Sequence, residues 1–159
     1  MPTAINRASR LAFLVVLLLD IVPVGASEAG VPVKPKNSAE ATVMAFLDAA
    51  FNQRKFDKAF AKYVGPEYRQ HNPTVADGKQ AVIDALRRWL PATPALHYEF
   101  KHVYSDGDHV IVHSLVTVSA DDRGKAVIDI FRLEHGKVVE HWDVAQPVPE
   151  KSANDNTMF

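Results

Sequence analysis

The fold is decided by the stretch Lys125-Ala-Val-Ile-Asp-Ile-Phe-Arg-Leu-Glu134, His135-Gly136, Lys137-Val-Val-Glu-His-Trp-Asp-Val-Ala145. Both arms are rich in β-branched and aromatic residues, and their side-chain types follow the period of two that is typical of strands. The His135-Gly136 pair between them indicates a tight turn. The two arms are therefore predicted to form an antiparallel hairpin.

Two more strands are predicted upstream, over residues 96–104 and 109–119. The turn Ser105-Asp-Gly-Asp108 joins them, and a second turn, Asp121-Asp-Arg-Gly124, leads into the hairpin. Because the four segments follow one another at short spacing, they predict an antiparallel meander.

Helical periodicity precedes the strands. Asn37 or Ser38 is a candidate N-cap for a first helix, with Glu40 in its first turn as in a capping box. Two further helices are predicted over residues 56–63 and 79–90. Helices first and a meander of strands afterwards predict a single α+β domain.

The N-terminus has the pattern of an export signal. Arg7 and Arg10 precede the apolar run 11–19, which is too short for a bilayer span of about 20 residues. Small residues follow at positions 24–26, so cleavage after Ala26 is expected. The alternatives are cleavage after Ala29, an uncleaved membrane anchor and a buried first helix. The predicted organisation is a signal peptide (1–26), a flexible tether (27–37), one domain (38–150) and a C-terminal tail (151–159). We expect a periplasmic or secreted protein that is not attached to a membrane after cleavage.

Composition excludes several classes of function. The 159 residues carry a formal net charge of −1 with the two signs interspersed, so no basic surface for nucleic acid is expected. The chain has no cysteine, which excludes disulfides and thiolate chemistry. Hydrophobic residues make up 47% of the chain, enough for a real core.

Asp129 is the most unusual residue of the predicted sheet, because its immediate neighbours in the strand are apolar. A carboxylate in such a place needs hydrogen-bond partners. It is either an acid/base group or a structural charge, held for example by Arg132 or Arg123. His113 stands in another apolar strand that is expected to lie beside it, and an imidazole next to a carboxylate suits proton transfer near neutral pH.

Other polar residues could complete a pocket. By strand parity, Phe131 shares a face with Asp129, and His141 and Asp143 share a face opposite Trp142 and Val138. Candidate ligand-binding residues are Tyr68, His71, Asn72, Phe131, His141 and Asp143. A zinc or iron site among the histidines and aspartates is an alternative, but no His-x-x-x-His pair or cysteine supports it, and no metal is expected.

Several motifs carry a resemblance to a known family. They are Tyr68-Arg-Gln-His-Asn-Pro73, Asp77-Gly-Lys79, Val103-Tyr-Ser-Asp-Gly-Asp108, Asp129-Ile-Phe-Arg132 and Gly136-Lys-Val-Val-Glu-His-Trp-Asp-Val-Ala-Gln-Pro147. Over residues 38–150 the chain resembles the SnoaL-like polyketide cyclase family of the nuclear-transport-factor-like superfamily, and its last residues resemble a subgroup labelled as aldol-condensation enzymes. The resemblance implies a cone in which three helices pack on a strongly curved, mainly antiparallel sheet. It also implies a ligand pocket, a homodimer and catalysis without cofactor.

In the family's cyclases a pocket aspartate assisted by a histidine moves protons, and Asp129 and His113 resemble that pair. The expected function is acid/base catalysis of the aldol, cyclase or isomerase type on a small apolar carbonyl compound. One alternative is a non-catalytic binding protein for a small molecule. A second is hydrolysis like that of limonene-epoxide hydrolases, which place an arginine between two aspartates. Asp129 and Asp143 could match those aspartates, but Arg132 has the opposite parity.

Overall fold

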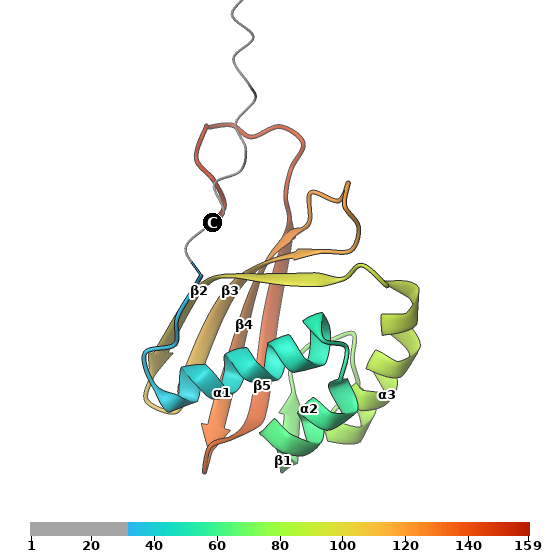
Figure 1. Cartoon of the computed structure of the whole chain (residues 1–159), viewed down its shortest axis with the longest axis vertical. Helices are drawn as coiled ribbons and strands as arrows, with labels where there is room; N and C mark the ends of the chain where they lie inside the picture. Colours follow the sequence, from blue (N-terminus) through green and yellow to red (C-terminus); the bar gives the residue numbers. More distant parts are fainter. Residues whose placement is uncertain (1–31) are drawn as a thin grey trace, which may run out of the picture.

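The computed structural model describes residues 32–159, in which helices cover one face of a curved five-stranded sheet (Figure 1). The predicted signal peptide and the first part of the tether lie outside the described residues. The helices are α1 (Ser38–Leu47), α2 (Phe56–Tyr63) and α3 (Lys79–Trp89), with a π-helical turn η1 (Asp48–Asn52) and a 3-10 turn η2 (Leu90–Ala92). The strands are β1 (Val64–Gln70), β2 (His97–Asp106), β3 (His109–Thr117), β4 (Lys125–Glu134) and β5 (Lys137–Pro147). They are arranged in the order β1-β5-β4-β3-β2.

Helix α1 begins as the sequence predicts. The Asn37 side chain accepts a hydrogen bond from the Glu40 backbone N–H at 2.9 Å, so Asn37 is the N-cap. The Glu40 carboxylate, which is buried, accepts from the Lys36 backbone N–H and from the Ser105 hydroxyl on β2. The cap therefore also fixes the start of the helix against the sheet.

The sheet contains one strand that the sequence analysis missed. Strand β1 pairs in parallel with β5, whereas the other neighbouring strands are antiparallel. It contains Gly65 and Pro66, which are poor strand residues, and it shows no clear alternation. Its position at the edge explains the proline, because an edge strand leaves backbone N–H groups unpaired on one side. The predicted meander of four strands is thus correct but incomplete.

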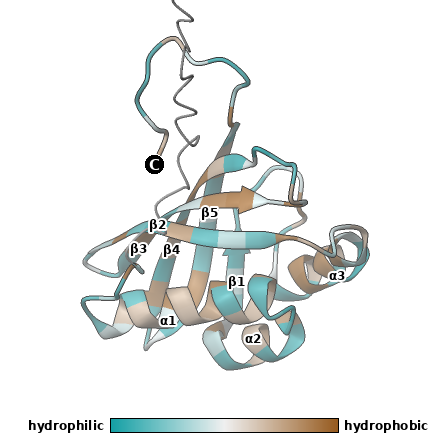
Figure 2. Ribbon diagram, turned by 45° about the horizontal axis from the view of Figure 1, so that its top comes forward, coloured by the Kyte–Doolittle hydropathy of each residue, from teal (hydrophilic) through white to brown (hydrophobic). Residues whose placement is uncertain are grey.

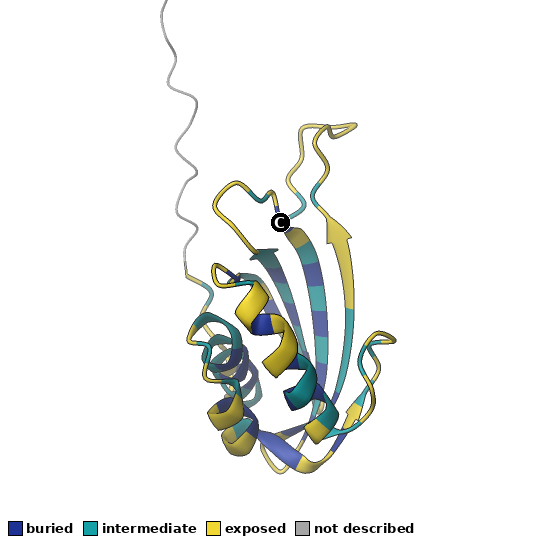
Figure 3. Ribbon diagram, turned by 90° about the vertical axis from the view of Figure 1, so that its right-hand side faces the viewer, coloured by how far each residue is buried: buried dark blue, intermediate teal, exposed yellow. Residues whose placement is uncertain are grey.

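The two faces of the sheet have different environments. Along the central strands buried residues alternate with half-buried ones (Figure 3), and apolar residues recur on these strands behind α1 (Figure 2). On the inner face Phe131 packs edge-on against Phe46 of α1, which in turn meets Phe60 of α2 at 5.1 Å between ring centroids. The outer face carries exposed apolar side chains such as Tyr104 and Val144.

The predicted fold class is confirmed. Three helices pack on a curved, mainly antiparallel sheet, and the described helices and strands build one hydrophobic core. Within residues 32–159 no helix is long and apolar enough to cross a membrane.

Gly124, which precedes β4, gives a test of this packing. Its φ is +80°, and a Cβ atom there would lie 2.6 Å from the Val116 carbonyl oxygen. We expect Gly124→Ala to lower the free energy of unfolding by about 3 kcal/mol, through backbone strain and overpacking together. Urea denaturation measures the change.

The matched control is Gly107→Ala in the β2–β3 turn. Gly107 also has a positive φ, +58°, but no atom lies within 4 Å of the position that a Cβ atom would take there. Its substitution should cost only about 1 kcal/mol, from the backbone alone. If both variants lost the same free energy of unfolding, the close packing around Gly124 would not contribute to stability.

Candidate functional site

A cavity of about 560 Å³ lies between the inner face of the sheet and the helices. Its wall is mainly apolar and aromatic, with Phe46, Phe51, Phe60, Leu86, Val127 and Phe131 among the lining residues. The lining also includes the exposed residues Thr74, Trp89, Lys125 and Ala145, so the cavity opens to the surface between α3 and the ends of β4 and β5. A small apolar molecule fits a cavity of this size and lining.

Asp129 points into this cavity from the middle of β4 and is only 4% exposed. Its Oδ1 lies 2.9 Å from Nε2 of His141 on β5. Its Oδ2 is buried and has no hydrogen-bond partner in residues 32–159. A buried carboxylate oxygen without a partner is costly in a folded protein, which marks this atom as a place where a ligand or a proton is expected.

The partners of His141 define where its protons lie. Gln70 Oε1 accepts from the Asn72 backbone N–H at 3.0 Å, so this atom is an acceptor. His141 Nδ1, 3.1 Å from the same oxygen, must therefore donate to it. A further proton then lies between His141 Nε2 and Asp129 Oδ1, on either atom. The His141 ring also stacks on Phe131, which holds its orientation.

Asp143 lies beside Asp129, since the two residues are direct neighbours across β4 and β5. The Asn72 side-chain amide donates to both Asp143 oxygens at 2.9 Å. The two carboxylates therefore differ: Asp143 is held by an amide, whereas Asp129 keeps one oxygen free. Unequal surroundings of this kind separate the roles of paired carboxylates.

Two tyrosines bring hydroxyl groups to the cavity from the two edge strands, Tyr68 from β1 and Tyr98 from β2. Burial, together with the charges of Asp129 and Asp143, raises the pKa of both phenols far above the usual value, so both remain protonated. The Tyr68 oxygen accepts from the Gln70 amide at 3.3 Å. Within residues 32–159 this hydroxyl donates no hydrogen bond, so its hydrogen is available to a ligand.

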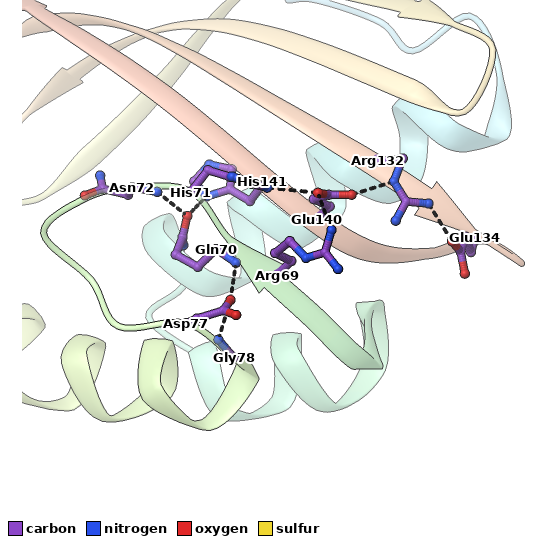
Figure 4. A network of polar contacts seen from close by, with 10 residues as sticks. All are labelled: Arg69, Gln70, His71, Asn72, Asp77, Gly78, Arg132, Glu134, Glu140 and His141. Atoms are coloured by element: carbon purple, nitrogen blue, oxygen red, sulfur yellow. Dashed lines mark hydrogen bonds and ion pairs between the residues drawn. The ribbon is translucent and has the colours of Figure 1, made fainter.

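The site is assembled where β1 runs beside β5 (Figure 4). Gln70 and Asn72 point inward to His141 and Asp143, while His71, between them, points to the outer face. There His71 contacts Glu140 at 2.8 Å and stacks on Trp142. The side chain of His71 therefore does not line the cavity, contrary to the prediction that it binds a ligand there.

The predicted partnership of His113 with Asp129 is also wrong. The residue opposite Asp129 on β3 is Val112, and His113 pairs with Ile128 on the outer face. There its ring stacks near His102 and Phe159. Partial burial, followed by the charges of His102 and Lys101, lowers the pKa of His113. Strand parity showed which residues share a face within one strand, but it did not give the register between strands.

The structure brings six of the eight predicted site residues to the cavity: Tyr68, Asn72, Asp129, Phe131, His141 and Asp143. The cavity is also lined by four residues that were not predicted from the sequence, namely Gln70, Tyr98, Trp89 and Lys125. Gln70 alternates with Tyr68 and Asn72 at a spacing of two, and reading this segment as a strand would have found it. In the part of the chain that the structure describes, no three His, Asp or Glu side chains gather closely enough to hold a metal ion.

Comparisons with known proteins agree with this architecture. The family model described as a SnoaL-like domain matches residues 43–141, more than half of the chain. A candidate polyketide cyclase from Acidithiobacillus ferrooxidans has a similar structure, with a TM-score of 0.63 and 15% identity over 71% of this chain and 91% of its own. TsrD from Streptomyces laurentii is also similar, with a TM-score of 0.57 and 24% identity over 70% of this chain and 91% of its own. A candidate SnoaL-like isomerase from Agrobacterium tumefaciens has a TM-score of 0.58 and 13% identity over 69% of this chain and 99% of its own. No curated protein sequence matches the chain significantly.

Glu140 behind the site allows a test by pH. Its buried carboxylate accepts hydrogen bonds from His71 and from Arg132, and these bonds lower its pKa. Since the folded-state pKa is lowered, the carboxylate stabilises the fold at neutral pH, and this contribution is lost as the pH falls through that lowered pKa. We expect Glu140→Gln to lower the free energy of unfolding by about 2 kcal/mol at neutral pH and to weaken its decline on acidification.

Glu134→Gln is the control for this experiment. Glu134 pairs with the same guanidinium but is exposed, so its loss should change the free energy of unfolding by less than about 0.5 kcal/mol. Urea denaturation at a series of pH values compares both variants with the wild type. Equal pH profiles for wild type and Glu140→Gln would show that Glu140 does not stabilise the fold in this way.

Proposed function

The chain belongs to the SnoaL-like domain family, and on this premise we propose that it catalyses acid/base chemistry without a cofactor on a small, mostly apolar carbonyl compound. The observation that carries the proposal is the unpartnered Asp129 oxygen, which faces an apolar cavity while the other oxygen meets His141. Catalytic bases are found in such clefts, beside a titratable partner. The structural neighbours described as cyclases and as an isomerase favour the same class of reaction.

Proton abstraction would begin at Asp129 Oδ2. The bond between carbon and hydrogen next to the carbonyl breaks, the proton joins Oδ2, and the electron pair moves to the carbonyl oxygen to form an enolate. His141 takes the place that the sequence analysis gave to His113. It shares a proton with Oδ1, and this proton can shift toward Nε2 as Oδ2 becomes protonated, so that no second proton accumulates on the carboxyl group.

The enolate oxygen needs a donor. Tyr68 supplies one, because its oxygen already accepts from Gln70 and its hydrogen is free. The enolate then either attacks a second carbonyl, as in an aldol closure, or is protonated at another carbon, as in an isomerisation. The choice between these outcomes depends on the substrate and not on Asp129 itself.

Two alternatives make different demands on the site. A binding protein needs no base, yet Asp129 contacts a histidine and no arginine in the described residues, which favours chemistry. Hydrolysis of the epoxide-hydrolase type uses an arginine between two aspartates. Arg132 instead bonds Glu140 and Glu134 on the outer face, and no arginine lines the described cavity, so this alternative is disfavoured.

Deuterium exchange tests the proposal. The protein is incubated in heavy water with a panel of enolisable aryl ketones, and mass spectrometry follows the label at the carbon next to the carbonyl. We expect Asp129→Asn to slow exchange by at least about 100-fold and His141→Gln by at least about tenfold, because each removes part of the proton relay.

His113→Gln is the matched control, since it changes a histidine on the outer face and should keep the exchange rate within about twofold. Circular dichroism checks that each variant is folded. An active Asp129→Asn variant would overturn the assignment of the base. Saturable ketone binding without exchange in the wild type would favour the binding protein.

We also propose that the chain is exported and forms a homodimer through the outer face of the sheet. In the described structure no helix covers this face, and it carries half-buried Ile128, Ile130 and Trp142 beside exposed Val144. Export is tested by mass spectrometry of the mature protein, which should find a chain that begins at Ser27. The homodimer is tested by light scattering, which should give twice the mass of one chain. Val144→Glu should shift the protein toward monomer, because it places a charge in an apolar contact. A full-length, monomeric wild type would contradict both expectations.

A further inference from the structure

The cavity has opposite charges at its two ends. Asp129 and Asp143 lie side by side on its inner wall, and Lys125 stands at its mouth. All three share the inner face of the sheet: Asp129 follows Lys125 by an even number of residues along β4 and is the direct neighbour of Asp143 across the strands. The side chains between the two ends are largely apolar. Such an arrangement distinguishes the two ends of an elongated ligand.

Lys125 has no ion pair or side-chain hydrogen bond in residues 32–159, although it stands on a pocket-lining position. Asp122 is close enough for the Lys125 charge to contribute to the lowering of its pKa, after the backbone hydrogen bonds. The Asp122 oxygens accept from the backbone N–H groups of Gly124 and Val118, and in the described residues no ion pair joins Asp122 to Lys125. The ammonium group is therefore available to a ligand.

We propose that Lys125 is a specificity-determining residue and that the substrate is an amphipathic keto acid, with its carbonyl at Asp129 and its carboxylate at Lys125. This inference rests on the proposed function, whose substrate class it narrows. Neutral carbonyl compounds of the same shape are the poorer ligands.

The strand sets the distance between the two ends. Lys125 and Asp129 are four residues apart on β4, or about 13 Å between their Cα atoms, and the lysine side chain can shorten this span by several ångströms. A ligand that joins them needs a spacer of a few methylene groups between its carbonyl and its carboxylate. Both shorter and much longer acids lose one of the two contacts.

Electrostatics also fixes the direction of entry. A ligand that entered carboxylate first would bring its negative charge beside Asp129 and Asp143 in an apolar cavity, where like charges repel strongly. Entering carbonyl first, it places its carboxylate beside Lys125 in partly solvated surroundings. The same charges therefore select the acid and orient its reactive carbon toward the base.

Calorimetric titration with a graded series tests the inference. The full chain is titrated with benzoylpropionate, benzoylbutyrate, benzoylvalerate and longer homologues, and with the methyl ester of each. We expect the acids to bind more tightly than their esters, with an optimum at intermediate spacer length. Lys125→Gln should lower the affinity for the best acid by about fivefold and leave the affinity for its ester unchanged. Lys125→Glu should lower the affinity for the acid further.

Lys58→Gln is the matched control, because it makes the same change of net charge at an exposed position on α2 outside the cavity. It should leave the affinity for every acid unchanged. Equal binding of acids and esters, an equal effect of Lys125→Gln on both, or failure of every acid to bind would overturn the inference.

Deuterium exchange with the same compounds separates this inference from the proposed function. If the acids bind through Lys125 but no exchange occurs, the keto-acid preference stands and the catalytic proposal fails. If acids and esters exchange at equal rates and Lys125→Gln has no effect, the catalytic proposal stands and the role of Lys125 is overturned.

Discussion

The parallel pairing of β1 with β5 is the contact on which the site depends. Without it the sheet would be an antiparallel meander ending at β5, and His141 and Asp143 would lie on an open edge. The pairing supplies hydrogen-bond partners to three polar residues of β5: Gln70 to His141, His71 to Glu140 and Asn72 to Asp143. Polar residues of the two segments thus satisfy one another, which allows polar groups to occur beside an apolar core.

This arrangement leaves very few polar atoms unsatisfied, and they are informative. In the described residues the Asp129 Oδ2 atom and the Ser114 hydroxyl are the buried side-chain atoms without partners. Ser114 is fully buried on β3 and has no visible connection to the chemistry. Asp129, in contrast, has one satisfied oxygen and one free oxygen at the wall of a cavity. A structural charge would be expected to use both oxygens, so the asymmetry favours a functional role.

Much of the fold could be predicted from the sequence, because its signals are local. The period of two and the turn residues predicted β2 to β5, and the Asn37 cap predicted the start of α1. Strand β1 could not be predicted from the sequence, because its pairing with β5 spans about half of the chain and its residues have low strand propensity. The pairing of His113 with Asp129 failed for a related reason. Register between strands depends on turns and bulges, and a shift of one residue places a side chain on the opposite face.

A bulge in β5 explains how the core and the site share one strand. Val138 pairs with Leu133 and Glu140 pairs with Arg132, so Val139 is the extra residue. Val138 is fully buried, and His141, three positions later, also faces inward. In a regular strand an odd spacing would place them on opposite faces, as the sequence analysis expected. Gly65 of β1 lies against the Val139 side chain, where a Cβ atom would be 3.0 Å from Cγ1, so the edge strand leaves room for the bulge. The poor strand propensity that concealed β1 is thus part of what positions His141 at Asp129.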